Sequence, residues 1–133
     1  MRIGLVGCGK GKRAEPAAAR RLYTGALFRK ASAYCVENYD AWYILSAKHG
    51  LLEPDTALAP YDLSLRMLTA DERRAWGERV LGQIEERAFR DAAFFIHAGQ
   101  RYAEHLETAL RAERPLRGLG IGRQLAWYTG RGY

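Results

Sequence analysis

Residues 1–12 have the sequence MRIGLVGCGKGK, an apolar run that ends abruptly in glycines. The run from Ile3 to Val6 is typical of a buried strand, and the glycines at positions 7, 9 and 11 are typical of a tight loop that follows it. Glycine has no Cβ atom, so the N–H groups of such a loop can approach a ligand closely. The loop is therefore predicted to hold a phosphate or the polar edge of a base through Gly7, Cys8, Gly9, Lys10 and Lys12.

Strand-like and helix-like patterns alternate through the rest of the chain. The spacing of apolar residues predicts helices over residues 26–39, 69–87, 101–111 and 124–129, with Thr24 capping the first and a Thr69–Glu72 capping box opening the second. Apolar runs predict strands over residues 41–46, 92–97 and 116–119. Residues 47–68 contain two prolines and are expected to be irregular. This alternation predicts one α/β domain over residues 1–133 with a mainly parallel, four-stranded sheet.

The composition limits the classes of protein to which the chain can belong. A length of 133 residues fits one domain, and no apolar run reaches the ~20 residues of a membrane span. We therefore expect a cytoplasmic protein with no membrane partner. Cys8 and Cys35 lie far apart and form no disulfide or metal-ligand pattern, so we expect neither a metal nor a cofactor. The net charge of +6 is compatible with a nucleic-acid partner, but it is also common in arginine-rich proteins that bind none.

Three expected strand ends carry polar or glycine-rich segments, and a parallel sheet would bring these ends to one edge. The segments are Gly7-Cys8-Gly9-Lys10, Ser46-Ala47-Lys48-His49-Gly50 and His97-Ala98-Gly99. Lys48 can pair with a phosphate or carboxylate, His49 can transfer protons near neutral pH, and Ser46 can form a hydrogen bond to the ligand. The sequence therefore predicts a single ligand site at this edge.

Four further candidates lie outside these strand ends. Asp62 can act as a general base or orient His49, and Tyr61 and Tyr23 can stack on a base. Arg101 lies where a helix is expected to begin and can reach an anion. Asp62 also has a plain structural interpretation as a turn or helix-cap aspartate, and most tyrosines in the position of Tyr23 pack with the hydroxyl at the surface.

The segments LVGCGKGK, LYTGALFRKA, WYILSAKHGLL, APYD, HAGQRY and GLGIGRQLAW follow one another along nearly the whole chain. Together they resemble a family of small bacterial and phage domains of unknown function. More distantly, the pairing of the glycine loop with the Ser-Ala-Lys segment resembles the uracil-DNA-glycosylase-like domain of archaeosine synthase, which modifies a deazaguanine base in tRNA. The Cys-Ser-Ala-Lys-Lys-Pro-Tyr-Ser signature of that domain is not present, and Gly7 to Lys12 would be its counterpart. The resemblance implies a three-layer Rossmann-like sandwich and a nucleobase or nucleotide ligand.

These observations favour an enzyme that acts on a base or nucleotide, with base modification or glycosidic-bond chemistry on nucleic acid as the expected class. The expected catalytic residues are His49, Asp62 and Lys48, and the expected binding residues outside the glycine loop are Tyr23, Ser46, Tyr61, Gly99 and Arg101. The alternative is a module that binds a nucleotide or nucleic acid without chemistry. A phosphatase or phosphotransferase is less favoured, because few carboxylates that could hold Mg²⁺ lie near the loops. The oligomeric state stays open.

Overall fold

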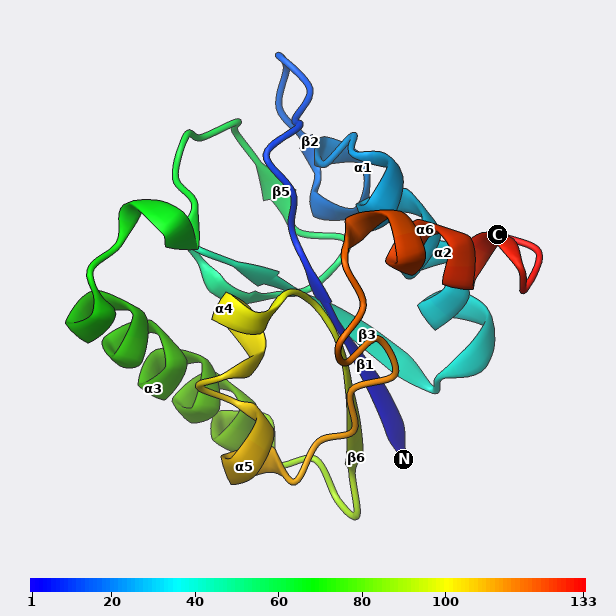
Figure 1. Cartoon of the computed structure of the whole chain (residues 1–133). Coiled ribbons are helices and arrows are strands. Elements are labelled where there is room, and N and C mark those ends of the chain that lie inside the picture. Colours follow the sequence, from blue (N-terminus) through cyan, green and yellow to red (C-terminus); the bar gives the residue numbers. More distant parts are fainter.

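The computed structural model describes residues 1–133, which fold around a four-stranded sheet in the order β4-β3-β1-β6 (Figure 1). The strands are β1 (Arg2–Gly7), β3 (Ala41–Ser46), β4 (Gly50–Leu52) and β6 (Ala93–His97). β1 pairs in parallel with β3 and β6, whereas β4 pairs antiparallel with β3. Residues 3–6 of β1 are all buried, as expected for a central strand covered on both faces. The predicted α/β class and the mainly parallel sheet are therefore confirmed.

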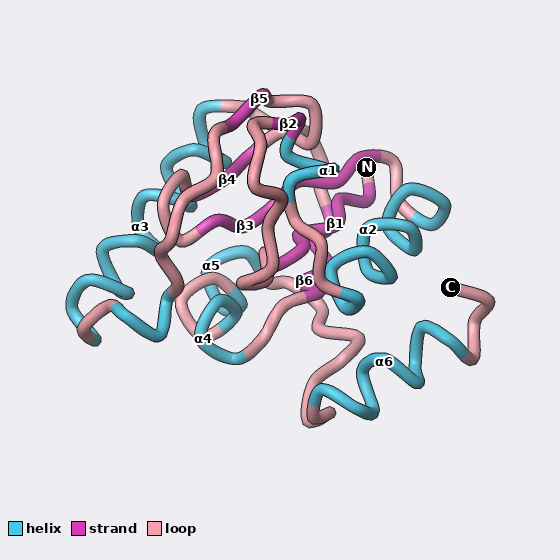
Figure 2. The backbone as a smooth tube through the Cα atoms, turned by 90° about the horizontal axis from the view of Figure 1, so that it is seen from above, coloured by secondary structure: helices cyan, strands magenta, loops and turns pink.

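Helices lie on both sides of the sheet (Figure 2). They are α1 (Ala19–Leu22), α2 (Ala26–Asn38), α3 (Ala70–Glu86), α4 (Gln100–Ala103), α5 (Glu107–Leu110) and α6 (Ile121–Thr129). On one side, Phe28 of α2 and Tyr128 of α6 share a hydrophobic cluster with Val6 of β1. On the other side, Trp76 of α3 belongs to a second cluster with Leu5. Successive residues of β1 thus contribute to opposite cores. None of these helices combines the length and the apolar character that crossing a membrane requires.

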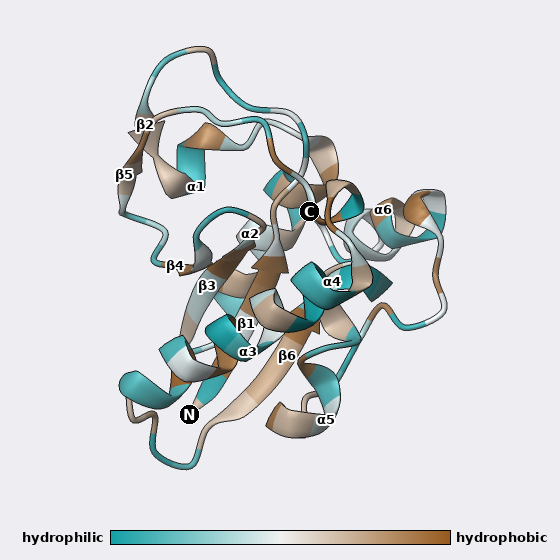
Figure 3. Cartoon of the chain, turned by 90° about the vertical axis from the view of Figure 1, so that its left-hand side faces the viewer, coloured by the Kyte–Doolittle hydropathy of each residue, from teal (hydrophilic) through white to brown (hydrophobic).

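The helix α3 begins where the sequence predicts it. The Thr69 hydroxyl accepts a hydrogen bond from the Glu72 N–H at 3.1 Å, and the Glu72 carboxylate accepts one from the Thr69 N–H at 2.8 Å. This reciprocal pair is the predicted capping box. Trp76, Val80 and Ile84 follow at intervals of four residues and are buried. Figure 3 shows hydrophobic residues along β1 and hydrophilic residues over much of α3, in keeping with one buried and one exposed face.

Two predictions in the second half of the chain were wrong. The helix expected over residues 101–111 is divided into α4 and α5. The division coincides with a close approach of His105 to α3, where a Cβ added to Gly77 would lie 2.5 Å from His105 Cβ. The strand expected over residues 116–119 is a turn. The free edge of β6 is instead used by Glu113, which forms two main-chain hydrogen bonds of 2.9 and 2.8 Å with Phe94 and Ile96.

Two expectations about the first half were also incorrect in detail. Residues 47–68, expected to be irregular, contain β4, a 3₁₀ turn (Leu65–Met67) and β5 (Ala57–Leu58), which pairs with β2 (Ala17–Ala18). These elements have only two or three residues each, so hydrophobic periodicity cannot detect them. The helix α2 is capped by Gly25 without a side-chain hydrogen bond, and not by Thr24.

The carboxyl ends of the three parallel strands lie at one edge of the sheet. From β1 the chain crosses to β3 on one side and later to β6 on the other, so the direction of crossing reverses beside β1. In open α/β sheets, ligands bind beyond the strand ends at such a reversal. The topology therefore places the expected site next to Gly7, the last residue of β1.

Candidate functional site

A cluster of hydroxyl groups and one thiol lies at this edge. Its members, called the Tyr61 cluster, are Cys8, Tyr23, Ser46, Tyr61 and Tyr102. The Tyr61 hydroxyl lies 2.5 Å from the Tyr23 hydroxyl and 2.6 Å from Ser46 Oγ, and it donates to Cys8 Sγ at 3.9 Å. Cys8 Sγ lies 3.4 Å from the Tyr102 hydroxyl, which donates to the Cys8 carbonyl oxygen at 3.2 Å. Side chains from five segments of the chain thus share one hydrogen-bonded network.

Backbone pairing explains how these side chains meet. The loop after β1 folds back on itself, so that Lys12 forms a bridge with Tyr23. The pairing of β2 with β5 holds the segment that carries Tyr61 against this loop. Ser46 ends β3 and is fully buried, and its carbonyl accepts a hydrogen bond from Trp76 Nε1 at 2.8 Å. Main-chain structure therefore contributes to the placement of the Tyr23, Ser46 and Tyr61 hydroxyl groups.

One arrangement of protons gives every hydroxyl group at the centre of the cluster an acceptor for its hydrogen bond. Tyr23 and Ser46 donate to the Tyr61 oxygen, and Tyr61 donates its own proton to Cys8 Sγ. Burial raises the pKa of Tyr61 and Tyr102, and the neighbouring Cys8 sulfur raises both further. Burial also raises the pKa of Tyr23 to about 12. At neutral pH the three phenols keep their protons and can act as hydrogen-bond donors.

Three basic side chains surround the Tyr61 ring. Lys12 Nζ lies 4.6 Å and Lys48 Nζ 5.7 Å from the ring centroid, within the range of cation–π attraction. The His49 ring packs edge-on against the same ring, with 5.3 Å between the centroids. Burial lowers the pKa of His49, and the positive charges of Lys48 and Arg79 lower it further. The imidazole is therefore uncharged at neutral pH and can accept a proton.

A small cavity lies beside the cluster, between the ends of β1 and β6. Its volume is about 100 Å³, and Cys8 and Tyr102 form part of its wall. Most of the remaining wall is apolar, with Phe28 and Tyr128 as the aromatic members and Gln124 as a polar one. An engineered cavity of about 150 Å³ in another protein binds one benzene molecule, so the cavity of about 100 Å³ has room for no more than about one flat ring.

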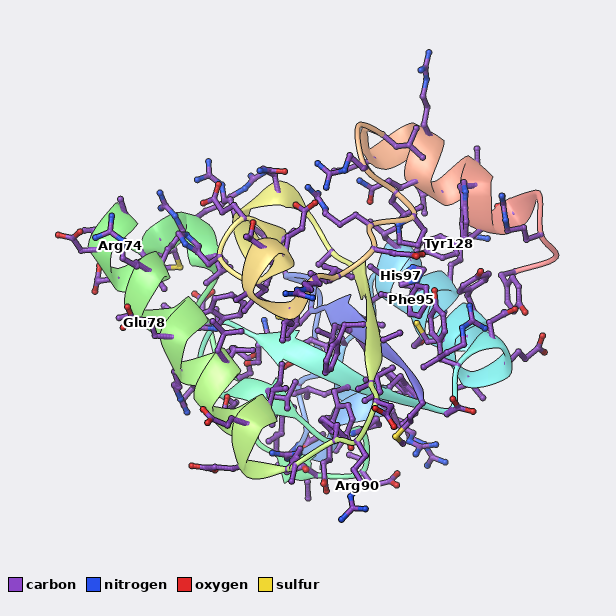
Figure 4. The ribbon with its side chains drawn as sticks, turned by 90° about the horizontal axis from the view of Figure 1, so that it is seen from below. Arg74, Glu78, Arg90, Phe95, His97 and Tyr128 are labelled. Carbon is purple, nitrogen blue, oxygen red and sulfur yellow. The ribbon has the colours of Figure 1, made fainter.

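His97, which also lines the cavity, has a structural role. Its Nε2 atom is 2.6 Å from the Tyr39 hydroxyl and its Nδ1 atom is 2.7 Å from the Tyr128 hydroxyl. Figure 4 shows His97 and Tyr128 next to each other where β6 meets α6. Burial lowers the pKa of His97 to about 4, which keeps the ring uncharged. Both ring nitrogens are therefore engaged, and Cys8 is the lining residue that carries a thiol, whose sulfur accepts from Tyr61.

The glycine loop, whose residue Gly9 lines this cavity, has main-chain N–H groups without a partner in the chain. The Cys8 N–H donates to the Leu45 carbonyl at 3.1 Å, whereas the N–H groups of Gly9, Lys10 and Gly11 donate no hydrogen bond within the chain. Three successive free N–H groups are suited to an anion or to the acceptor atoms of a base edge.

The predicted site residues fall into three groups. Those in contact with Tyr61 or its hydrogen-bonding partners are Cys8, Lys12, Tyr23, Ser46, Lys48 and His49. Gly7, Gly9 and Gly99 line the cavity, and Lys10 and Arg101 are exposed next to lining residues. Asp62 is exposed and forms neither a hydrogen bond nor an ion pair with His49. No group of three or more His, Cys, Asp or Glu side chains is arranged to hold a metal ion.

Sequence reasoning did not assign Tyr102, Gln124 or Phe28 to the site. Tyr102 was detectable, since it follows Gly99 by three residues and so lies near the end of β6. Gln124 and Phe28 are brought to the cavity by α6 and α2, and their spacing along those helices is that of ordinary core residues.

Comparison with known proteins gives two matches. A family described as a family of unknown function, DUF6884, matches residues 3–130. The uncharacterized protein YfjM of Bacillus subtilis (strain 168) is 30% identical over 145 residues, which cover 99% of this chain and 89% of that protein. Both matches agree with the expected resemblance to domains of unknown function. The comparisons lend no support to the expected link with uracil-DNA-glycosylase-like domains.

Proposed function

The chain belongs to the family of unknown function DUF6884, and from the geometry of its site we propose that the protein is an enzyme acting on a nucleobase or nucleotide. The base occupies the cavity between β1 and β6, and the chemistry is base modification or cleavage of the glycosidic bond. One observation carries this proposal: a cavity for a single ring shares Cys8 and Tyr102 with a network of hydroxyl groups.

The wall of the cavity supports a flat, aromatic ligand with polar edges. Phe28, Tyr102 and Tyr128 offer rings for stacking or edge contacts. Gln124 donates one N–H to the Leu119 carbonyl at 2.8 Å, which leaves its side-chain oxygen and its other N–H for a ligand. A purely apolar ligand would leave these groups and the free N–H groups of the glycine loop without partners, at a cost of about 1–3 kcal/mol each.

The Tyr61 cluster supplies proton donors and acceptors. Tyr61 and Tyr102 hold their protons and can donate them to a heteroatom that gains electron density. His49 is uncharged and can accept a proton, and Lys48 adds positive charge beside it. Asp62 contributes only if the segment after Tyr61 moves on binding, because it is exposed and forms no hydrogen bond or ion pair with a site residue.

The proposal keeps three finer expectations from the sequence. They are a three-layer Rossmann-like classification, a role in nucleic-acid base modification and a cytoplasmic location. The helices on both sides of the sheet and the reversal beside β1 support the first of these.

Thermal denaturation in the presence of bases, nucleosides and mononucleotides tests the binding part. A ligand at about 100 times its dissociation constant stabilises the native state by about 2.7 kcal/mol, which raises the melting temperature by several degrees. We expect such a shift for at least one base. If no base, nucleoside or nucleotide shifts the melting temperature, the proposal is wrong.

Tyr61→Phe tests the catalytic part, with Tyr43→Phe as the matched control. Both tyrosines are partly buried, but the Tyr43 hydroxyl takes part in no hydrogen bond. Mass spectrometry of the best ligand after incubation should show product with Tyr43→Phe and at least ~100-fold less with Tyr61→Phe. Binding without product in the unmodified protein would favour the alternative, a module that binds without chemistry.

A further inference from the structure

The positive charges of the chain are distributed unevenly with respect to its acidic groups. Of the 21 lysines and arginines, six form ion pairs with aspartate or glutamate. These six are Arg20, Arg73, Arg74, Arg87, Arg114 and Arg117. Arg117 follows the lining residue Leu116 and pairs with Glu107, whereas the other five are not adjacent in the sequence to a lining residue.

Three basic residues without an acidic partner stand next to residues that line the cavity. Lys10 follows the lining residue Gly9, Arg101 precedes Tyr102, and Arg123 precedes Gln124. All three basic side chains are exposed, and none forms an ion pair or a side-chain hydrogen bond within the chain. Three separate segments, the loop after β1, α4 and α6, therefore each carry one exposed, unpaired basic residue next to a residue that lines the cavity.

The size of the cavity determines which parts of a nucleotide lie outside it, where the basic side chains are. A space of about 100 Å³ accepts about one ring, so the sugar and phosphate attached to a bound base must lie outside it. A free mononucleotide brings its phosphate to one place only. A strand that continues on both sides of the bound nucleotide brings several phosphates, and these can meet several basic side chains at once.

We infer that the base in this cavity belongs to a single strand of nucleic acid, whose phosphates lie on Lys10, Arg101 and Arg123. This inference rests on the proposed function and adds the class of substrate to it. A single strand is favoured over a duplex because a base enters the cavity only after it has left its stack and its partner, which costs a duplex a few kcal/mol. DNA and RNA both offer a base between phosphates, so the test includes each of them separately.

The test is the salt dependence of binding, measured by fluorescence anisotropy with labelled single-stranded DNA and RNA of about ten nucleotides. Three phosphate contacts predict a slope of log K against log salt near −2, or about 20-fold weaker binding at about 200 mM than at about 50 mM salt. Arg101→Gln and Arg123→Gln should each reduce the slope by about 0.7. Arg90→Gln is the matched control, because Arg90 is exposed and unpaired but lies away from His97 and Tyr128 in Figure 4.

Three results would overturn the inference while leaving the proposed function intact. The first is a nucleoside that binds as tightly as the strand, with no salt slope for the strand. The second is a duplex of the same sequence that binds more tightly than the single strand. The third is an equal loss of slope with Arg90→Gln, which would mean that binding follows net charge and not the basic residues next to the cavity. If inorganic polyphosphate competes as well as the strand, the base does not contribute to binding and the inference is wrong. If no base or nucleotide shifts the melting temperature in the thermal test, the proposed function itself is wrong.

Discussion

Acidification should destabilise this protein through one buried histidine. His97 has no acidic neighbour, and its ring is surrounded by Tyr34, Tyr39, Trp127 and Tyr128. One ring nitrogen accepts a hydrogen bond from a tyrosine and the other donates one. A second proton would place a charge in this apolar surrounding and break the accepted bond. Burial accordingly lowers the pKa of His97 from 6.5 to about 4.

The sign and the size of the effect follow from this difference. Above the unfolded pKa of 6.5 neither state carries the proton, and the full stability is present. As the pH falls from 6.5 towards 4, the unfolded chain binds a proton that the folded chain does not, and the free energy of unfolding decreases by about 3 kcal/mol.

Urea denaturation between pH 7 and about pH 4 measures this loss, with His97→Gln as the comparison. The variant is expected to be less stable at pH 7, because Tyr39 and Tyr128 lose good partners. Between pH 7 and about pH 4, the free energy of unfolding of the variant should nevertheless fall by about 3 kcal/mol less than that of the unmodified protein, since the other titrating groups are common to both. Equal acid dependence of the two proteins would refute the assignment of His97 as a buried, uncharged residue.

Three further substitutions test the geometry of the site and of the fold. Gly7→Ala places a Cβ atom 2.9 Å from Ala98 Cβ, so the ends of β1 and β6 must separate. We expect the free energy of unfolding to fall by about 1–3 kcal/mol and the ligand-induced thermal shift to disappear, with an unchanged circular dichroism spectrum. Gly50→Ala introduces a side chain at a φ of +71° and 2.3 Å from the Gln83 oxygen, and urea denaturation should show about 1–3 kcal/mol of destabilisation. Thr69→Ala removes the capping box of α3 and should cost about 1 kcal/mol by the same assay, and an unchanged midpoint would contradict the role of the cap.

The parallel strands and the edge at which they end could be predicted from the sequence because they depend on local signals. A buried strand of four to six residues needs an apolar run, and glycines or polar residues must follow where the chain leaves the core. β1, β3 and β6 each satisfy both conditions. The same signals indicated the glycine loop and the Lys48–His49 turn as neighbours, which the shared contacts with Tyr61 bear out.

The centre of the cluster was harder to predict, because it depends on pairings between short, distant segments. Tyr61 reaches Tyr23 through the two-residue strands β2 and β5, which have no recognisable pattern. Its role as the hydroxyl shared by Tyr23, Ser46 and Cys8 is a consequence of that pairing. No hydrogen bond or ion pair joins His49 to Asp62, the expected acid–base pair, and the ring that His49 contacts is that of Tyr61.

The most direct test of the account is a titration of ¹⁵N-labelled protein with an equimolar mixture of the common mononucleotides, followed by amide chemical shifts. The largest changes are expected at Gly7, Gly9 and Gly99 and at the side-chain amide of Gln124, which line the cavity. An absence of chemical-shift changes would contradict a base-binding site between β1 and β6. So would changes that are largest in the second hollow, which lies between Arg29 of α2 and the C-terminal residue Tyr133.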